Sequence, residues 1–301
     1  MLTFLSRFKL WFIVSRPFSF TLSLFTVTLG LIISWYEISY INWFLAFLTF
    51  IGIFLLHLGA NLVSEYVDFK KGIDVSNIHT QGRILVRGLL IPKHVFWVGF
   101  FSFLVGIFVG LYIFYLTRIF WVLYLGLLGV ILAFFYGLAP FELKYRGLGE
   151  FAIFFTFGIG ITLGTFIVQS GFFSWLSLFL SLPQALLILA VLQGNNYRDL
   201  EIDAGFGMKS LSILFGKRFA FFEYVLLVVL PFILVFVYLL LDIVDYWSLL
   251  TFLTFPLALK NIIALKNENE KIFSIIDVHT AQLHMIFTLL FIISLLPSFV
   301  F

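Results

Sequence analysis

The first residues able to do chemistry lie in the segment NLVSEYVDFKKGID. Asn61, Glu65 and Asp68 occupy positions i, i+4 and i+7, and this spacing puts three side chains on one face of a helix. Asp74 follows Gly72 and is a weaker candidate. The segment therefore presents several oxygen ligands at the end of an apolar stretch.

A second group repeats the pattern in NNYRDLEIDAGFGMKSL. Asp199 and Asp203 are four residues apart, and Asn195 and Asn196 stand about one turn before them. Proteins usually bind Mg²⁺ through one or two carboxylates together with phosphate oxygens of a substrate. A single acidic pair is equally well explained as a solvated helix end. Two matching groups that face each other favour a site for a metal–diphosphate complex.

A diphosphate carries several negative charges, so basic and amide donors are expected near the acidic groups. The enrichment of Lys and Arg in cytoplasmic loops of membrane proteins is a sufficient explanation for any one basic residue. Because they gather in the same loops as the carboxylates, the set as a whole favours diphosphate binding. The candidates are Lys144, Arg146, Arg198, Asn195, Arg83, Arg87 and Lys209.

Aromatic and imidazole side chains near these loops have simpler explanations. Tyr66, Tyr136 and Tyr145 are candidates for stacking on an aromatic acceptor or a carbocation, but interfacial aromatic residues need no function. His57 and His284 lie in or beside apolar stretches. No two histidines have the spacing of metal ligands, so interhelical hydrogen bonds are favoured for both.

The elements that must position these residues are membrane-spanning helices. Of 301 residues, 62% are hydrophobic and 11% are charged, which is too little polar surface for a water-soluble domain of this length. A helix needs about 20 apolar residues to cross a bilayer. We therefore predict an all-α polytopic membrane protein, with a single transmembrane domain over residues 1–301. The nine apolar stretches cover 10–34, 42–64, 94–116, 119–139, 150–169, 173–196, 219–241, 246–265 and 282–301.

The basic residues predict the orientation of these spans. If the N-terminus is cytoplasmic, 17 of the 18 Lys and Arg residues fall on the cytoplasmic side and only Arg118 falls outside. This sorting agrees with the positive-inside rule, and an even number of spans would break it. Nine spans, a cytoplasmic N-terminus and a site facing the cytoplasm are the resulting expectations.

Composition also excludes several classes of function. Cysteine is absent, which rules out a disulfide framework and a thiolate metal site. No soluble basic surface is available for nucleic-acid binding. Nothing in the sequence indicates an obligate protein partner.

The two acidic groups resemble those of the UbiA superfamily of intramembrane prenyltransferases. That superfamily carries an Asn-x-x-x-Asp motif after its second helix and an Asp-x-x-x-Asp motif after its sixth; here they read Asn61-x-x-x-Glu65 and Asp199-x-x-x-Asp203. The resemblance covers the whole chain, and LKYRGLGE and NNYRD look most like the 1,4-dihydroxy-2-naphthoate prenyltransferase branch. The matching segments are SRPFSFT at 15–21, HLGANLVSEYVDFKKGID at 57–74, RILVRG at 83–88, YGLAPFELKYRGLGE at 136–150, FGIGITLGTFIVQSG at 157–171 and NNYRDLEIDAGFGMKSL at 195–211.

The resemblance implies a fold and a reaction. The helices would surround a central cavity that opens to lipid and holds the isoprenoid tail, with the diphosphate at the cytoplasmic mouth. Mg²⁺ would be the cofactor, and the substrates would be a prenyl diphosphate and an aromatic acceptor. With 1,4-dihydroxy-2-naphthoate, alkylation with loss of CO₂ would give a demethylmenaquinone in the cytoplasmic membrane. The implied metal ligands are Asn61, Glu65, Asp68, Asp199 and Asp203, of which Asp68, Asp199 and Asp203 would be catalytic.

Two departures and several alternatives accompany this interpretation. Glu65 stands where the family has Asp and Ser64 where this branch has Asn, and the extra methylene of Glu moves its carboxylate by about one bond length. A UbiA-type enzyme for another acceptor, such as 4-hydroxybenzoate, is one alternative. A transporter is another, but transporter sites lie near the membrane midplane whereas these carboxylates lie at the edge. CDP-alcohol phosphotransfer is disfavoured because its Asp-Gly-x-x-Ala-Arg signature is absent.

Overall fold

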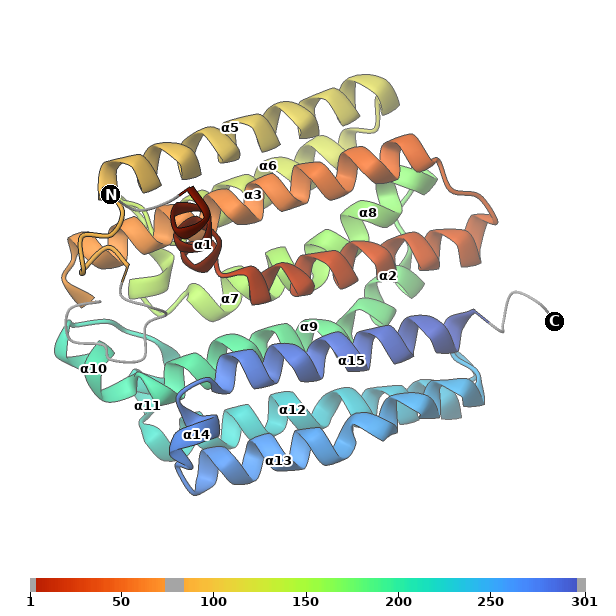
Figure 1. The fold of residues 1–301 in the computed structure, drawn as a ribbon. Helices are drawn as coiled ribbons and strands as arrows, with labels where there is room; N and C mark the ends of the chain where they lie inside the picture. Colours follow the sequence, from red (N-terminus) through yellow and green to blue (C-terminus); the bar gives the residue numbers. More distant parts are fainter. Residues whose placement is uncertain (1–3, 74–83, 297–301) are drawn as a thin grey trace.

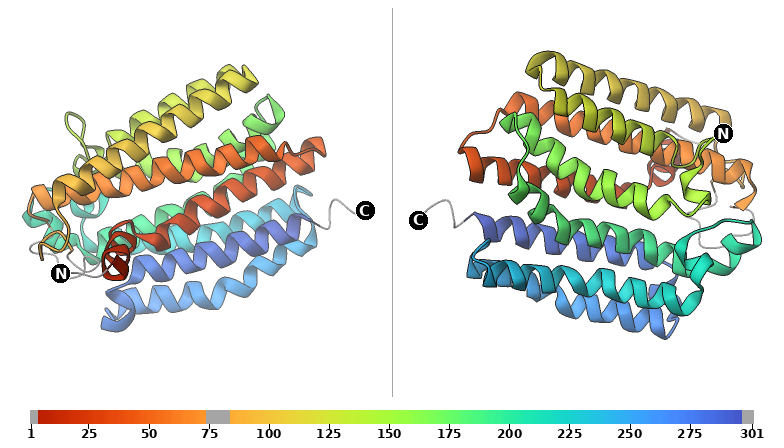
Figure 2. Two further views of the ribbon diagram at one scale, coloured as in Figure 1. Left: turned by 45° about the horizontal axis from the view of Figure 1, so that its top comes forward. Right: turned by 180° about the vertical axis from the view of Figure 1, so that it is seen from behind.

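The computed structural model describes residues 4–73 and 84–296 of the chain. Throughout this part the regular elements are helices, without strands. Figures 1 and 2 show the long helices running side by side, with α3, α5 and α6 along one side of the bundle, α12, α13 and α15 along the other, and α2, α8 and α9 between them. The all-α membrane fold expected from the sequence is confirmed. Asp74 and Arg83 lie outside the described residues.

The long helices follow the order of the apolar stretches, with short elements at the charged end of the bundle. The first half contains α1 (Phe4–Val14), η1 (Pro17–Ser19), α2 (Phe20–Ile38), α3 (Trp43–Lys70), α5 (Pro92–Thr117), α6 (Phe120–Phe134), η2 (Leu143–Tyr145), α7 (Gly149–Ile153), the π-helix η3 (Phe154–Gly160) and α8 (Ile161–Ser170). The second half contains α9 (Trp175–Arg198), α10 (Leu200–Gly205), α11 (Leu211–Phe215), α12 (Lys217–Leu240), η4 (Tyr246–Thr254), α13 (Phe255–Lys266), α14 (Glu270–Phe273) and α15 (Ile276–Leu295).

The number of membrane crossings stays a prediction. Among the described residues, eight helical segments are long and apolar enough to cross a bilayer, whereas α6 has 15 residues and is shorter. The stretch expected over 119–139 ends at Phe134 as a helix. The chain then turns before Pro140, which cannot donate to a helix and restricts the residue before it. The last span begins at Ile276, earlier than the expected residue 282.

The first expected span, 10–34, is divided into two helices. Helix α1 ends at Val14, and the membrane-crossing segment runs from Pro17 to Ile38. Arg16 between them adopts a left-handed conformation with φ 56° and ψ 61°. The ring of Pro17 disfavours a right-handed helical conformation in the residue before it, so the first helix cannot continue through Arg16. Helix α1 therefore crosses the direction of the long helices at one end of the bundle (Figures 1 and 2).

Glycines allow α3 and α5 to approach closely. A Cβ atom at Gly59 would lie 2.6 Å from Cδ2 of Phe103 and 2.8 Å from the carbonyl oxygen of Gly99. A Cβ atom at Gly99 would lie 2.9 Å from Cβ of Leu62. This packing fixes the position of the end of α3, where Glu65 and Asp68 lie.

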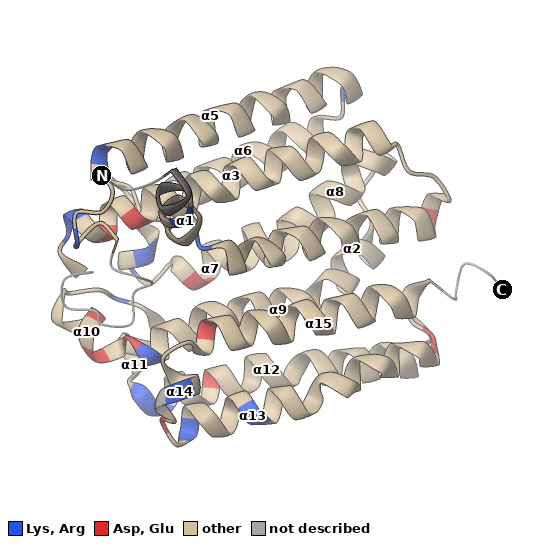
Figure 3. Cartoon of the chain, in the orientation of Figure 1, with Lys and Arg blue, Asp and Glu red and all other residues tan. Residues whose placement is uncertain are grey.

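The charged residues gather at one end of the bundle (Figure 3), where α3 and α9 end and α10, α11 and α14 lie. The opposite end carries few charges, among them Glu37 at the end of α2 and Arg118 between α5 and α6. Such asymmetry suits a helical bundle whose apolar middle lies in lipid. The candidate site residues therefore share one end of the molecule.

The close contact between α3 and α5 generates a test of the fold. Gly99→Ala should lower the free energy of unfolding by about 1–3 kcal/mol, because the added methyl overlaps Leu62. Gly126→Ala in α6 is the matched control: nothing lies within 4 Å of its added Cβ, so it should be neutral or stabilising by up to about 1 kcal/mol. Thermal unfolding in detergent, followed by circular dichroism, measures both. Equal shifts would contradict the packing.

Candidate metal and diphosphate site

Asp68 is the most enclosed carboxylate at the end of α3. It is 4% exposed, and Nζ of Lys144 donates to its two oxygens at 2.8 and 2.7 Å. Tyr145 donates its hydroxyl proton to Oδ1 at 2.6 Å. Burial alone would lower the pKa of Lys144, but the Asp68 carboxylate outweighs burial and raises that pKa. Lys144 therefore stays charged beside Asp68.

Glu65 is held by a residue that the sequence did not single out for function. Nη2 of Arg16 donates to Oε2 of Glu65 at 2.8 Å and lies 4.0 Å from Oδ2 of Asp68. The left-handed backbone of Arg16 points to a constraint, since this conformation costs a non-glycine residue about 1–2 kcal/mol. The feature of the sequence that could have pointed to Arg16 is its place before Pro17 in the segment SRPFSFT.

Arg198 is saturated by protein acceptors. Its Nε and Nη2 donate to the two oxygens of Asp199 at 2.9 and 2.7 Å, and Nη1 donates to Asp277 at 3.1 Å and to the carbonyl oxygen of Ser274 at 3.3 Å. Nη2 also donates to Oδ1 of Asn195. A guanidinium has five N–H donors, and all five are used. In this arrangement Arg198 orients Asp199 and has no free donor, and its expected role toward a diphosphate stays a prediction.

Among the four carboxylates of the two acidic motifs, Asp203 is the one that has no cationic partner in the described residues. It is 8% exposed, and within the described residues it forms no ion pair. Burial raises the pKa of its carboxyl to about 7; Lys144 opposes this rise, whereas the charges of Asp199 and Asp68 add to it. A cation placed here would favour the ionised form.

The acidic groups provide a donor set that fits Mg²⁺. In the part of the chain described, no three acidic or histidine side chains converge as a metal centre, and Glu65, Asp68 and Asp199 are each held by a cationic side chain. The donors nevertheless are all oxygens, as Mg²⁺ requires. The charge of Asp203 is the one that a bound cation would compensate directly.

Other amide and acidic residues stabilise the loops around the site. Asn196 donates to Oε1 of Glu150 at 3.0 Å, and the same oxygen accepts the backbone N–H of Leu211 at 3.1 Å. Glu150 is 5% exposed. It thus ties α7 to α9 and α11, a role that the sequence did not reveal. Asn196 serves the scaffold, whereas Asn195 faces the site.

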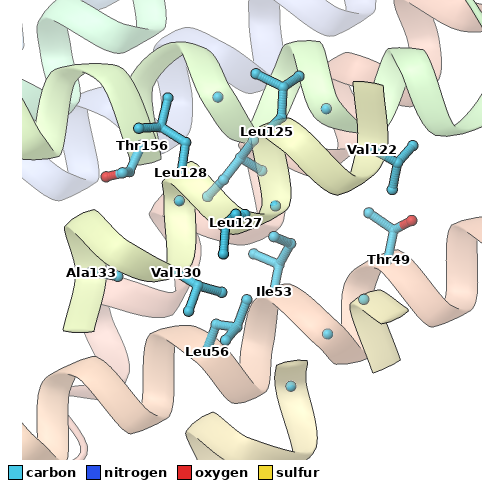
Figure 4. A pocket seen from close by; sticks show the side chains of 18 of the residues that line it. Thr49, Ile53, Leu56, Val122, Leu125, Leu127, Leu128, Val130, Ala133 and Thr156 are labelled. Carbon is cyan, nitrogen blue, oxygen red and sulfur yellow. The ribbon is translucent and has the colours of Figure 1, made fainter. Parts of the chain in front are cut away.

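Two cavities adjoin one another inside the bundle. The first, here called the mouth cavity, has about 150 Å³ and is lined by Arg16, Asn61, Tyr136, Asn195 and Asp277 among others. The second, here called the apolar cavity, has about 260 Å³ and lies between α3, α5, α6 and the η3–α8 segment; Figure 4 shows its side chains. Five residues line both cavities, so the two are contiguous. They are His57, Leu132, Ala133, Thr156 and Phe157.

The apolar cavity also reaches the outer surface of the bundle. Leu111, Leu127 and Leu128 line it and are 45%, 57% and 52% exposed. Helix α6, which supplies Leu127 and Leu128, has no buried residue. The surface around it is apolar, so in a bilayer this side of the cavity would face lipid.

The remaining expected site residues are dispersed. Arg87, Arg146 and Lys209 are exposed, and none of the three lines either cavity. Of the tyrosines, Tyr136 lines the mouth cavity and burial raises its pKa to about 12. Tyr66 instead packs on Phe96, with ring centroids 5.0 Å apart. The hydrogen bonds expected for the histidines are confirmed, to Ser19 and Ser23 for His57 and to Gln184 for His284.

Comparison with protein families gives one match over most of the chain. The sequence model of the UbiA prenyltransferase family matches residues 23–296. These residues include both acidic groups and η2. They also include most of the helices that line the two cavities; η1 and the first residues of α2, which contribute Ser19 and Leu22 to the mouth cavity, lie before the matched range.

Two curated relatives are similar in sequence. UbiA prenyltransferase domain-containing protein 1 of Xenopus tropicalis is 32% identical over 226 residues, which are 73% of this chain and 63% of that protein. The 1,4-dihydroxy-2-naphthoate octaprenyltransferase of Bacillus subtilis is 28% identical over 205 residues, 68% of this chain and 65% of that protein. The matches thus span slightly less than two thirds of these relatives.

A solved structure shares the fold. It is that of a UbiA homolog from Archaeoglobus fulgidus bound to GPP and Mg²⁺, with a TM-score of 0.60, 12% sequence identity, and coverage of 94% of this chain and 99% of that chain. At this identity the likeness concerns the arrangement of helices.

The saturation of Arg198 generates a stability prediction. Its side chain is 5% exposed, and removing one partner of a buried ion pair costs about 3–5 kcal/mol. Arg198→Met should therefore lower the free energy of unfolding by about that amount without any substrate present. Arg87→Met, at an exposed position, should stay within about 0.5 kcal/mol. Denaturation in detergent measures both, and an unaltered stability of the Arg198 variant would refute the buried network.

Proposed function

This chain belongs to the UbiA prenyltransferase family, and from that premise we propose that it transfers a long-chain prenyl group from a prenyl diphosphate to 1,4-dihydroxy-2-naphthoate. The C–O bond to the diphosphate breaks, and its electron pair leaves with the diphosphate. A C–C bond forms to the acceptor ring, CO₂ departs, and the product is a prenylated naphthalenediol, the reduced form of demethylmenaquinone. The naphthoate acceptor is favoured by the LKYRGLGE and NNYRD segments and by the named activity of the Bacillus subtilis relative.

The observation that carries the proposal is the contiguity of the two cavities. A prenyl diphosphate has an anionic head joined to an apolar tail. The mouth cavity has a mainly apolar lining to which Arg16, Asn61, Asn195 and Asp277 add polar groups, and Arg16 links it to the Glu65 carboxylate. The apolar cavity continues from it through five shared lining residues. An ion pathway would need polar groups along its whole length, so this arrangement favours an amphipathic substrate over ion transport.

The residues at the mouth would bind and orient the head. Asn61, Glu65, Asp68, Asp199 and Asp203 would hold Mg²⁺, which when bound neutralises charge on the leaving diphosphate. Lys144 is the basic residue best placed to assist, since its ammonium group lies against Asp68. The cations that now hold the carboxylates would become available to the diphosphate as Mg²⁺ takes their place. Arg146, Arg87 and Lys209 would contribute only if their loops closed over the head.

The apolar cavity would keep water from the reacting carbon. An allylic carbocation reacts quickly with water, and the lining of the apolar cavity is aliphatic and aromatic apart from a few threonines and His57. Tyr136 lines the mouth and remains protonated, so its ring can face a cation or the acceptor. Exclusion of water also strengthens each charge interaction at the mouth. We propose that the protein lies in the cytoplasmic membrane with this mouth facing the cytoplasm.

Metal dependence is the direct test of this function. The purified protein should release diphosphate from a long-chain prenyl diphosphate when both Mg²⁺ and 1,4-dihydroxy-2-naphthoate are present, and a chelator should stop the release. Mass spectrometry should identify the prenylated, decarboxylated product. Release that continues in excess chelator would rule out the metal. A product formed only with 4-hydroxybenzoate would replace the proposed acceptor.

Asp203 offers the sharpest single variant. Asp203→Asn keeps the size of the side chain and breaks no ion pair, so the protein should stay folded, yet turnover should fall by more than about 100-fold because a metal ligand is lost. Glu201→Gln is the matched control, since Glu201 is an exposed acid in the same helix α10. Similar activities of the two variants would remove Asp203 from the metal site.

Ala133 tests the path of the tail, because it lines both cavities. Ala133→Phe should raise the KM for a long-chain donor by about 10-fold, about 1.4 kcal/mol, and should affect a five-carbon donor much less. Val105→Phe adds the same bulk on the exposed face of α5, where Val105 is 48% exposed, and should change neither KM. Equal effects on both donor lengths would place the tail elsewhere.

A further inference from the structure

The Asn61 side chain is fixed by two acceptors on the neighbouring segment. Its Nδ2 donates to the carbonyl oxygen of Ser15 at 3.0 Å and to Oγ of Ser19 at 2.9 Å. These bonds use both amide protons, so the carbonyl oxygen is the atom left for the mouth cavity, which Asn61 lines. If the amide were reversed, its oxygen would meet the carbonyl oxygen of Ser15, and two acceptors cannot share a hydrogen bond.

Ser19 is itself constrained by His57. The Ser19 hydroxyl donates its only proton to the carbonyl oxygen of Arg16 at 2.8 Å, so it can only accept from Asn61 and from Nε2 of His57, 3.2 Å away. Nε2 of His57 must then carry a proton, and Nδ1 accepts one from Ser23 at 2.5 Å. The contacts define a chain from Ser23 through His57 and Ser19 to Asn61.

Packing holds this chain in place. His57 is 5% exposed, and its ring contacts those of Phe20 and Phe157 with centroids 5.1 and 4.6 Å apart. His57 also lines both cavities. The ring therefore lies where the two cavities join, and its hydrogen bonds lead toward the acidic groups at the mouth.

We propose that Ser19 and His57 are positioning residues that turn the carbonyl oxygen of Asn61 toward the metal and its amide nitrogen away. The inference rests on the proposed function, in which Asn61 is a metal ligand. A metal cation is coordinated by the oxygen of an amide, whereas the partly positive NH₂ group of an amide repels it. The orientation of the Asn61 side chain therefore decides whether this residue can bind the metal. Residues that orient metal ligands in this way typically change metal affinity by about 10- to 100-fold.

Metal binding without substrate gives the first measurement. Mn²⁺, which also binds oxygen ligands, can be titrated into the purified protein in detergent while electron paramagnetic resonance follows the free ion. Ser19→Ala should weaken Mn²⁺ binding by about 10-fold. Ser19→Thr keeps the hydroxyl and has space beside the mouth cavity, so its affinity should stay within about 2-fold of the wild type. Ser102→Ala removes an exposed hydroxyl on α5 and should have no effect.

A pair of double variants separates positioning from a general structural effect. If Ser19 acts through Asn61, Ser19→Ala should cause no further loss of Mn²⁺ affinity in an Asn61→Ala background. His57→Gln retains an N–H donor and should bind Mn²⁺ more tightly than His57→Leu, and this difference should also vanish without Asn61. Losses that persist in the Asn61→Ala background would overturn the proposal, as would an unchanged affinity of the Ser19→Ala protein.

The Mn²⁺-binding series and the diphosphate-release assay can fail independently of each other. A wild-type protein that binds Mn²⁺ but releases no diphosphate from any prenyl donor would contradict the proposed reaction and leave the orientation of Asn61 supported by the binding series. An active wild type with identical Mn²⁺ affinities in the whole series would retain the reaction and contradict the positioning role.

Discussion

The structure depends on how carboxylates are compensated at the end of an apolar bundle. Burying an ionised carboxylate costs several kcal/mol unless a cation or a set of donors replaces the lost water. Here Lys144, Arg16 and Arg198 compensate Asp68, Glu65 and Asp199. Lys144 lies in η2 and Arg16 in the turn before Pro17, so these two loops bring the cations to the carboxylates.

In the described part of the chain, three of the four carboxylates have a cation beside them and Asp203 has none, a difference that suits metal binding. Glu65, Asp68 and Asp199 each have a cation beside them, whereas burial and two neighbouring negative charges act against the ionisation of Asp203. A divalent ion would relieve that repulsion and release basic side chains toward an anionic ligand. The same groups thus stabilise the fold in the absence of ligand and, under the proposed function, would form the binding set in its presence.

The helices in the apolar part of the bundle differ in how tightly they pack. Helices α3 and α5 are packed through glycines, and the core around α9, α12 and α15 encloses fully buried side chains such as Tyr224, Phe287 and Phe291. Helix α6 buries no residue and covers a cavity. Tight packing on either side therefore leaves one loosely covered region, and it adjoins the polar mouth. An amphipathic substrate needs that combination of a rigid charged end and an accessible apolar path.

The sequence by itself determined the features that depend on composition and local spacing. Its apolar stretches required membrane helices, and its motifs identified the family, which the match over residues 23–296 confirms. Its acidic groups at helical spacing made Asp68, Asp199 and Asp203 candidate site residues, which stays a prediction. Tertiary structure decided which charges meet. Arg198 resembled a diphosphate ligand because its neighbours in sequence are acidic, but Asp277, 79 residues away, completes a network that uses all its donors. Arg16 and Glu65, which form an ion pair, are 49 residues apart. Ser19 and Asn61, which share a hydrogen bond, are 42 residues apart. Such pairings depend on how the helices pack, and hydropathy and local spacing carry no information about contacts between distant segments.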